Sequence, residues 1–121
     1  MPNQIQNPND KKYDLEERTA KFGENIIQFA KIVPKNTITI SFISQLIRSG
    51  TSIGANYMVV DGAESKKDFK HKIAICKKES KETMHWLRMI SKADISKKND
   101  ARKLWKEVHE LALIFSSIIK K

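Results

Sequence analysis

Residues 43–60 read Ile-Ser-Gln-Leu-Ile-Arg-Ser-Gly-Thr-Ser-Ile-Gly-Ala-Asn-Tyr-Met-Val-Val, and their spacing decides the fold class. Apolar or small residues recur at alternating intervals of three and four, which places them on one face of a helix. These positions are Ile43, Leu46, Gly50, Ile53, Tyr57 and Val60. The β-branched run 37–40 and the glycines Gly50 and Gly54 would also suit a strand. We favour a helix because the pattern persists for about five turns.

The same spacing recurs in three other segments, within residues 14–33, 65–90 and 100–118. The positions are Leu15, Thr19, Phe22, Ile26, Phe29 and Val33, then Phe69, Ile73, Cys76, Ser80, Thr83, Leu87 and Ile90, then Ala101, Leu104, Val108, Leu111, Phe115 and Ile118. Four amphipathic helices joined by short loops predict an all-α, up-down-up-down antiparallel four-helix bundle. The same pattern would also suit an array of helical hairpins completed by other subunits. We expect the bundle domain over residues 14–121, preceded by a flexible tail over residues 1–13.

Capping residues indicate where the helices begin and end. Asp14 and Ser65 are each followed three residues later by an acidic residue, the arrangement of a capping box. Pro34 ends the first helix, because the residue before a proline is biased away from helical geometry. Asn99 or Asp100 is expected to cap the fourth helix.

An antiparallel pairing of the second and third helices fixes their register. If the hairpin turns around residues 63–66, facing residues have numbers that add up to about 130. Gly50 is then level with Ser80, so that small residues meet at mid-helix. Arg48 is level with Glu82, which predicts an ion pair that fixes the register or a subunit contact. The residues expected at helix or subunit contacts are Arg48, Gly50, Tyr57, Glu79, Glu82 and Trp86.

Length and composition place the chain among globular proteins of one domain. It has 121 residues, of which 40% are hydrophobic and 31% charged. The single cysteine, Cys76, excludes an intramolecular disulfide, and residues 1–12 show no apolar signal segment. The apolar stretch 111–119 is interrupted by serines and is far too short to span a membrane. We therefore expect a cytoplasmic protein without a membrane partner.

The positive charge is concentrated in one third of the sequence. The net charge is +9, and residues 65–106 hold 14 Lys and Arg against 5 Asp and Glu, whereas the remainder is neutral. Such asymmetry indicates a polyanionic partner, with RNA favoured over DNA, although a lysine-rich solvated face is the alternative. The candidate nucleic-acid-binding residues are Lys67, Lys70, Lys77, Lys81, Arg88, Lys92, Lys98, Arg102 and Lys103.

Neither a metal centre nor a catalytic constellation is predicted. Glu82 and His85 have the Glu-x-x-His spacing of di-iron bundles, but the sequence lacks the second such pair that the site requires. Cys76 lies in the apolar pattern and lacks a recognisable base, and no Ser-His-Asp order or glycine-rich phosphate loop is present. We therefore predict that the protein is not an enzyme and needs no cofactor. Trp86 and Trp105 would be able to stack on bases, but packing between helices is favoured.

Five short segments resemble a known family. They are Asp14-Leu-Glu-Glu-Arg-Thr19, Gln45-Leu-Ile-Arg-Ser-Gly-Thr-Ser-Ile-Gly-Ala-Asn-Tyr57, Ser65-Lys-Lys-Asp-Phe69, Lys78-Glu-Ser-Lys-Glu-Thr83 and Trp86-Leu-Arg88. Over roughly residues 14–115 the chain resembles the four-helix bundle proteins encoded inside intervening sequences of bacterial 23S rRNA genes, also labelled S23 ribosomal protein. It departs from them at residues 58–60, Met-Val-Val, where an arginine and a glutamate are usual.

The resemblance implies a four-helix protomer that assembles into a ring-like homopentamer. A related branch, the accessory protein of diversity-generating retroelements, is a basic pentamer that binds nucleic acid and a reverse transcriptase. The first hypothesis is therefore a homo-oligomeric nucleic-acid-binding protein. The alternative is a structural assembly module that recruits a protein partner, such as a reverse transcriptase, without contacting nucleic acid.

Overall fold

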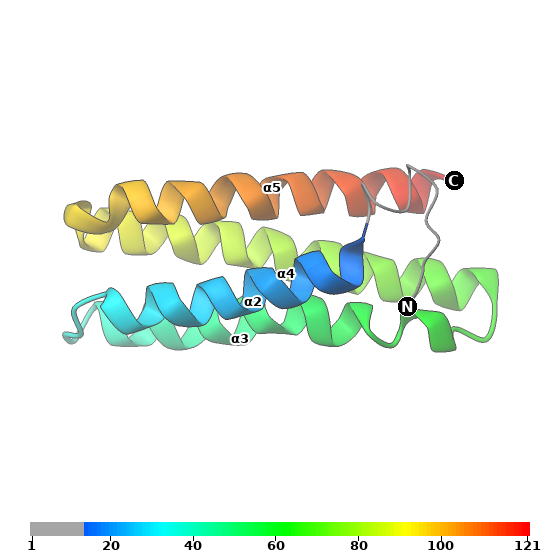
Figure 1. Ribbon diagram of the computed structural model, residues 1–121, viewed down its shortest axis with the longest axis horizontal. Coiled ribbons are helices and arrows are strands. Elements are labelled where there is room, and N and C mark those ends of the chain that lie inside the picture. The colour runs from blue at the N-terminus through cyan, green and yellow to red at the C-terminus, as the bar shows by residue number, and fades with distance from the viewer. Residues whose placement is uncertain (1–13) are drawn as a thin grey trace.

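The computed structural model describes residues 14–121, and these residues form four long α-helices and two short 3-10 turns. The α-helices are α2 (Leu15–Ile32), α3 (Thr39–Tyr57), α4 (Lys66–Ala93) and α5 (Lys98–Lys120). The α2–α3 and α4–α5 connections lie at one end of the molecule and the α3–α4 connection lies at the other (Figure 1). The described chain is therefore the predicted up-down-up-down bundle. The predicted flexible tail, residues 1–13, lies outside the described residues.

The predicted boundaries of the first helix are confirmed. The Asp14 carboxylate accepts a hydrogen bond from the Glu17 backbone N–H at 3.4 Å, and α2 begins at the next residue. The backbone turns extended at Val33, directly before Pro34. The side chains spaced along the predicted apolar face of α2, from Leu15 to Val33, are all buried.

The second helix begins at Thr39 because the turn before it satisfies its first N–H groups. The Asn36 side-chain oxygen accepts hydrogen bonds from the backbone N–H of Ile38 and of Thr39, each at 2.9 Å. Helix α3 ends at Tyr57, three residues before the predicted apolar pattern does. Val60 is nevertheless buried, because the 3-10 turn η1 (Val60–Gly62) directs it into the core.

Ser65 caps the third helix as predicted, but the second hydrogen bond of the capping box has a different donor. The Ser65 hydroxyl accepts a hydrogen bond from the Asp68 N–H at 3.0 Å, whereas the Asp68 carboxylate accepts from the N–H of Glu64 at 3.1 Å rather than of Ser65. The expected cap of the fourth helix at Asn99 or Asp100 is wrong. The turn η2 (Ile95–Lys97) follows α4 after one residue, so that α5 already begins at Lys98.

The predicted register of α3 against α4 is confirmed by contacts along the pair. The Thr83 hydroxyl donates to the Ser49 hydroxyl at 2.9 Å, and the rings of Phe42 and Trp86 lie 5.8 Å apart. The space beside Gly50, however, is filled by α2. A Cβ at Gly50 would lie 2.9 Å from Cγ1 of Ile26, so the need for glycine at this position comes from α2.

The helices of residues 14–121 do not include a candidate for a bilayer crossing, since none combines the required length with sufficient apolar content.

Candidate nucleic-acid interface

The basic residues of α4 and of the start of α5 are available to a partner in the folded chain. Of the nine predicted nucleic-acid-binding residues, Lys70 and Lys77 are half-buried and the other seven are exposed. Within residues 14–121, none of the nine has a carboxylate oxygen within 4.0 Å of its charged nitrogen. The lysine and arginine side chains are therefore neither buried within the protomer nor neutralised by it.

The acidic residues of the same region pair with other cations. Residues 66–121 contain seven carboxylates, and five of them form ion pairs with Arg18, Arg48 or Lys72. These five are Asp68, Glu79, Glu82, Glu107 and Glu110. These partners lie outside the predicted basic set, so the folded protein pairs five of the seven acidic groups with cations other than the nine candidates.

Helical geometry gathers most of the basic residues on one flank of α4. Intervals of three, four and seven residues return a side chain to nearly the same angle around a helix. Lys67, Lys70, Lys77, Lys81, Arg88 and Lys92 follow these intervals. Arg88 lines a cavity with residues of α5, so this flank turns toward α5, whereas Glu79 and Glu82 turn toward α3. We call these six residues, together with Lys98 and Arg102, the basic face.

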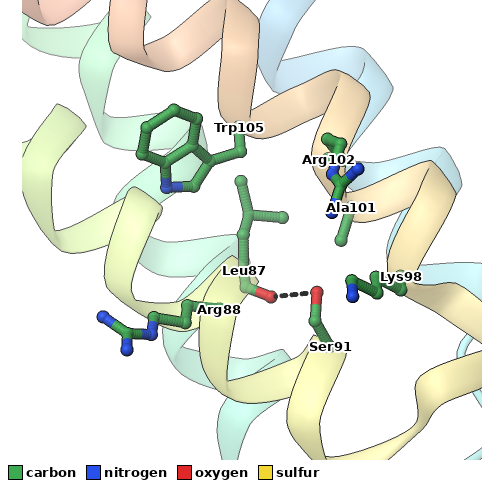
Figure 2. Close-up of a pocket in the computed structure, with 7 residues that line it drawn as sticks. All are labelled: Leu87, Arg88, Ser91, Lys98, Ala101, Arg102 and Trp105. Atoms are coloured by element: carbon green, nitrogen blue, oxygen red, sulfur yellow. Dashed lines mark hydrogen bonds between the residues drawn. The ribbon is translucent and has the colours of Figure 1, made fainter.

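A cavity of about 290 Å³ lies between α4 and α5, within the basic face. Its lining residues are Leu87, Arg88, Ser91, Lys98, Ala101, Arg102 and Trp105. Figure 2 shows Arg88 on one side of the Leu87 side chain and Arg102 and Lys98 on the other. Leu87 and Ala101 are each 1% exposed and form an apolar floor, while the three cations surround it.

Lys103 is separated from the other predicted binding residues. It lines a different cavity, of about 390 Å³, between α5 and α2, together with Asn25, Phe29 and Asp100. Although Lys103 is adjacent to Arg102 in the sequence, successive residues point about 100° apart around a helix. The structure therefore brings Arg88, Lys98 and Arg102 together and leaves Lys103 outside the group.

The predicted ion pair of Arg48 is present between α3 and α4. Its guanidinium donates to the Glu79 carboxylate at 3.2 Å and also to Glu82. The pKa of Arg48 is raised, mainly by the hydrogen bond with Glu82. The Arg48–Glu79 contact involves a carboxylate that is only 8% exposed, so it anchors the register of the two helices.

The other residues predicted at helix contacts lie within the bundle. Trp86 packs against Phe42 of α3, and the Tyr57 ring lies 6.2 Å from that of Phe115 in α5. Burial is the main cause that raises the pKa of Tyr57. Both aromatic residues therefore have partners inside the protomer.

The residues considered for metal binding or nucleophilic chemistry occupy structural positions. Glu82 pairs with Arg48, and the His85 ring packs edge-on against Trp86 at 4.7 Å. Residues 14–121 contain no group of three or more His, Cys, Asp or Glu that would hold a metal ion. Cys76 is fully buried, and burial raises the pKa of its thiol to about 11, which disfavours the reactive thiolate.

Two features of the site were not predicted from the sequence. The cavity is lined in part by Leu87, Ser91 and Ala101. The sequence pattern assigned Leu87 and Ala101 only to the core, and it gave Ser91 no role. Arg18 of α2 bridges to Glu107 at 2.8 Å and Glu110 at 2.6 Å across the bundle. The i, i+3 spacing of the two glutamates is a signal that one cation faces both.

Comparisons with known proteins agree with this fold. The sequence model of the 23S rRNA-intervening sequence protein family matches residues 11–117. A crystal structure from Bacteroides thetaiotaomicron, of a protein of unknown function from the S23 ribosomal protein family, superposes with a TM-score of 0.78. The two sequences are 27% identical, and the match covers 88% of this chain and 98% of that one. No match was found among curated proteins. Because the family match spans most of the sequence, the chain belongs to the 23S rRNA-intervening sequence protein family.

Proposed function

We propose that the protein is a non-enzymatic, homo-oligomeric nucleic-acid-binding protein that binds RNA through its basic face. The observation that carries the proposal is the absence of carboxylate partners for these cations within residues 14–121. Cations without internal partners can exchange their counterions for phosphates, and counterion release is the main driving force of such binding. RNA is favoured because the family is named after intervening sequences of 23S rRNA.

The dimensions of the basic face suit a nucleic-acid backbone. Lys70 and Lys92 are separated by 22 residues of α4, which corresponds to about 33 Å. Neighbouring cations along this flank lie about one to two turns apart, or roughly 5–11 Å, so that they can track successive phosphates. Lys98 and Arg102 add cations from α5 beside Arg88 of α4, which widens the contact.

Exposed apolar residues on α2 and α3 support assembly, and we propose a homopentamer. Ile27 and Ile47 are 41% and 37% exposed, and Met58 and Val59 in the α3–α4 turn are more than half exposed. Ile26 opposes Gly50 between these helices, so Ile27 and Ile47 lie at similar heights along the α2–α3 pair. Neighbouring exposed apolar side chains, such as Ile27 and Ile47, are typical of protein contacts. A contact on α2 and α3 would leave the basic face free.

Charge reversal at Lys70, Lys77 and Lys81 tests the proposed function. We expect the affinity for a labelled RNA, measured by fluorescence anisotropy, to fall at least about tenfold. The slope of log affinity against log salt concentration should decrease by about 2, because three phosphate contacts are lost. A reversal that leaves both the affinity and the slope at wild-type values would contradict the proposal.

The matched control reverses three exposed lysines outside the basic face, Lys21, Lys31 and Lys120. It changes the net charge equally, so a similar loss of affinity would show only a general charge effect. A second comparison uses neighbours: Arg102→Glu should weaken binding more than Lys103→Glu, because Lys103 faces α2. A wild-type protein that binds no RNA at low salt would favour the alternative, a module that recruits a protein partner.

A further inference from the structure

We propose that the cavity between α4 and α5 receives one unstacked base of single-stranded RNA, whose flanking phosphates contact Arg88, Lys98 and Arg102. This inference rests on the proposed function and adds the class of nucleic acid that the basic face prefers. A surface that only neutralises phosphates would not need an apolar cavity between its cations. The combination of both features in one cavity is the basis of the proposal.

The cavity has the size and the surface chemistry for a flat ring with charged neighbours. Its volume of about 290 Å³ lies at the small end of the range for small-molecule pockets. The floor, Leu87 and Ala101, is apolar. The Ser91 hydroxyl donates its hydrogen to the Leu87 carbonyl oxygen at 2.9 Å. This wall therefore offers no hydroxyl hydrogen for a base edge, and we expect little discrimination among bases.

Trp105 supplies an aromatic surface at the cavity. The His109 ring stacks on the Trp105 ring, with the centroids 4.8 Å apart and the planes inclined by 18°. One face of the indole is thus covered, which leaves the other face and the ring edge to line the cavity. Stacking of a base on an aromatic side chain changes affinity by about five- to hundredfold and is tolerant of sequence.

The combination of three cations with an apolar floor indicates which class of ligand fits the cavity. Arg88 approaches from α4, and Lys98 and Arg102 approach from the first turns of α5, so that cations flank the floor on two sides (Figure 2). A free phosphate would use the cations but not the apolar floor, and an apolar peptide would use the floor but not the cations. A nucleotide within a strand uses both. A duplex base cannot, because it is paired and stacked inside the helix.

The first test blocks the cavity and keeps every cation. Ser91→Leu places a larger side chain at the cavity wall, and loses a hydrogen bond only within its own helix. The matched control is Ser116→Leu, because Ser116 makes the same bond, to the Ala112 carbonyl at 2.9 Å, outside the cavity. We expect Ser91→Leu to lower the ratio of single-strand to duplex RNA affinity by about five- to hundredfold, and Ser116→Leu to leave it at the wild-type value. A wild-type ratio in Ser91→Leu would overturn the proposal.

The second test does not depend on a cavity variant. Trp86→Phe keeps the aromatic contact with Phe42 and leaves Trp105 as the sole tryptophan. Single-stranded RNA at saturation should quench the fluorescence of Trp105, and duplex RNA should not. Equal binding of both RNAs without quenching would overturn the base site and leave the basic face intact. Absence of salt-dependent binding to either RNA would overturn the proposed function itself.

Discussion

Replacement by alanine should change the stability of the protein differently at the two glycines of the α2–α3 contact, Gly23 and Gly50. A Cβ at Gly23 would lie 3.6 Å from its nearest neighbour, the Cα of Thr51, which is ordinary van der Waals contact. A Cβ at Gly50 would lie 2.9 Å from Cγ1 and 3.1 Å from Cγ2 of Ile26, a side chain that is completely buried. Both glycines lie inside helices, so replacement by alanine brings each the same gain in helix propensity, about 1 kcal/mol.

The difference between the two variants therefore isolates the cost of overpacking. Gly23→Ala should raise the free energy of unfolding by about 0.5–1 kcal/mol. Gly50→Ala should be less stable than Gly23→Ala by about 1–3 kcal/mol, because Ile26 branches at Cβ and cannot move both γ carbons away. Urea unfolding followed by far-ultraviolet circular dichroism measures both variants at one protomer concentration, since the proposed assembly would make stability concentration-dependent.

A double-mutant cycle shows whether Ile26 is the cause. In an Ile26→Ala background both γ carbons are absent and only the Cβ contact at 3.3 Å remains, so Gly50→Ala should be less destabilising than in wild type by about 1–3 kcal/mol. Ile26→Val retains both γ carbons and should give no such relief. Equal stabilisation by Gly23→Ala and Gly50→Ala in the wild-type background would refute the close approach of α2 to α3 at Gly50.

Two further predictions concern Cys76 and the oligomeric state. The folded chain raises the pKa of Cys76 to about 11 from an ordinary value of 9.0, so the unfolded chain loses this proton first. The stability that wild type has over Cys76→Ala should therefore be constant well below pH 9 and fall as the pH rises through 9, by about 2 kcal/mol at pH 11, as measured by urea unfolding. A difference that is independent of pH would show that burial does not hold the proton. Native mass spectrometry should find five protomers, and Ile27→Glu with Ile47→Glu should dissociate them. A monomeric wild-type protein at micromolar concentration would contradict the proposed assembly.

Local signals in the sequence predicted most of the architecture. Asp14, Pro34 and Ser65 define helix ends through interactions within a few residues, and the structure places the ends where these residues indicate. The register of α3 against α4 was also predictable, because a short antiparallel hairpin leaves little freedom. The α4–α5 connection was not, since the Asp94 carboxylate accepts the N–H of Ser96 in a short 3-10 turn, and α5 begins before the predicted caps Asn99 and Asp100.

The sequence predicted which basic residues share a flank of α4, but it did not predict the cavity between α4 and α5. Intervals of three, four and seven residues assigned Arg88 to a flank of α4, yet the sequence did not show what that flank faces. The cavity depends on how α5 is rotated, and that rotation separates Arg102 from Lys103. The small residue Gly50 shows the same limit, because the pattern identified a close approach but assigned it to α4 rather than α2.

The distribution of ion pairs supports the proposed binding of a polyanion at the α4–α5 contact. Arg18 bridges α2 to α5 and Arg48 bridges α3 to α4, whereas within the described chain no ion pair joins α4 to α5. Cations from both helices surround one cavity there, so they repel one another across a contact that apolar side chains hold together. In the proposed complex, a phosphate at this cavity would reduce the repulsion as well as form new contacts. The proposed binding at the basic face would therefore relieve a repulsion between cations of α4 and α5, whereas the α2–α5 and α3–α4 contacts already hold ion pairs of their own.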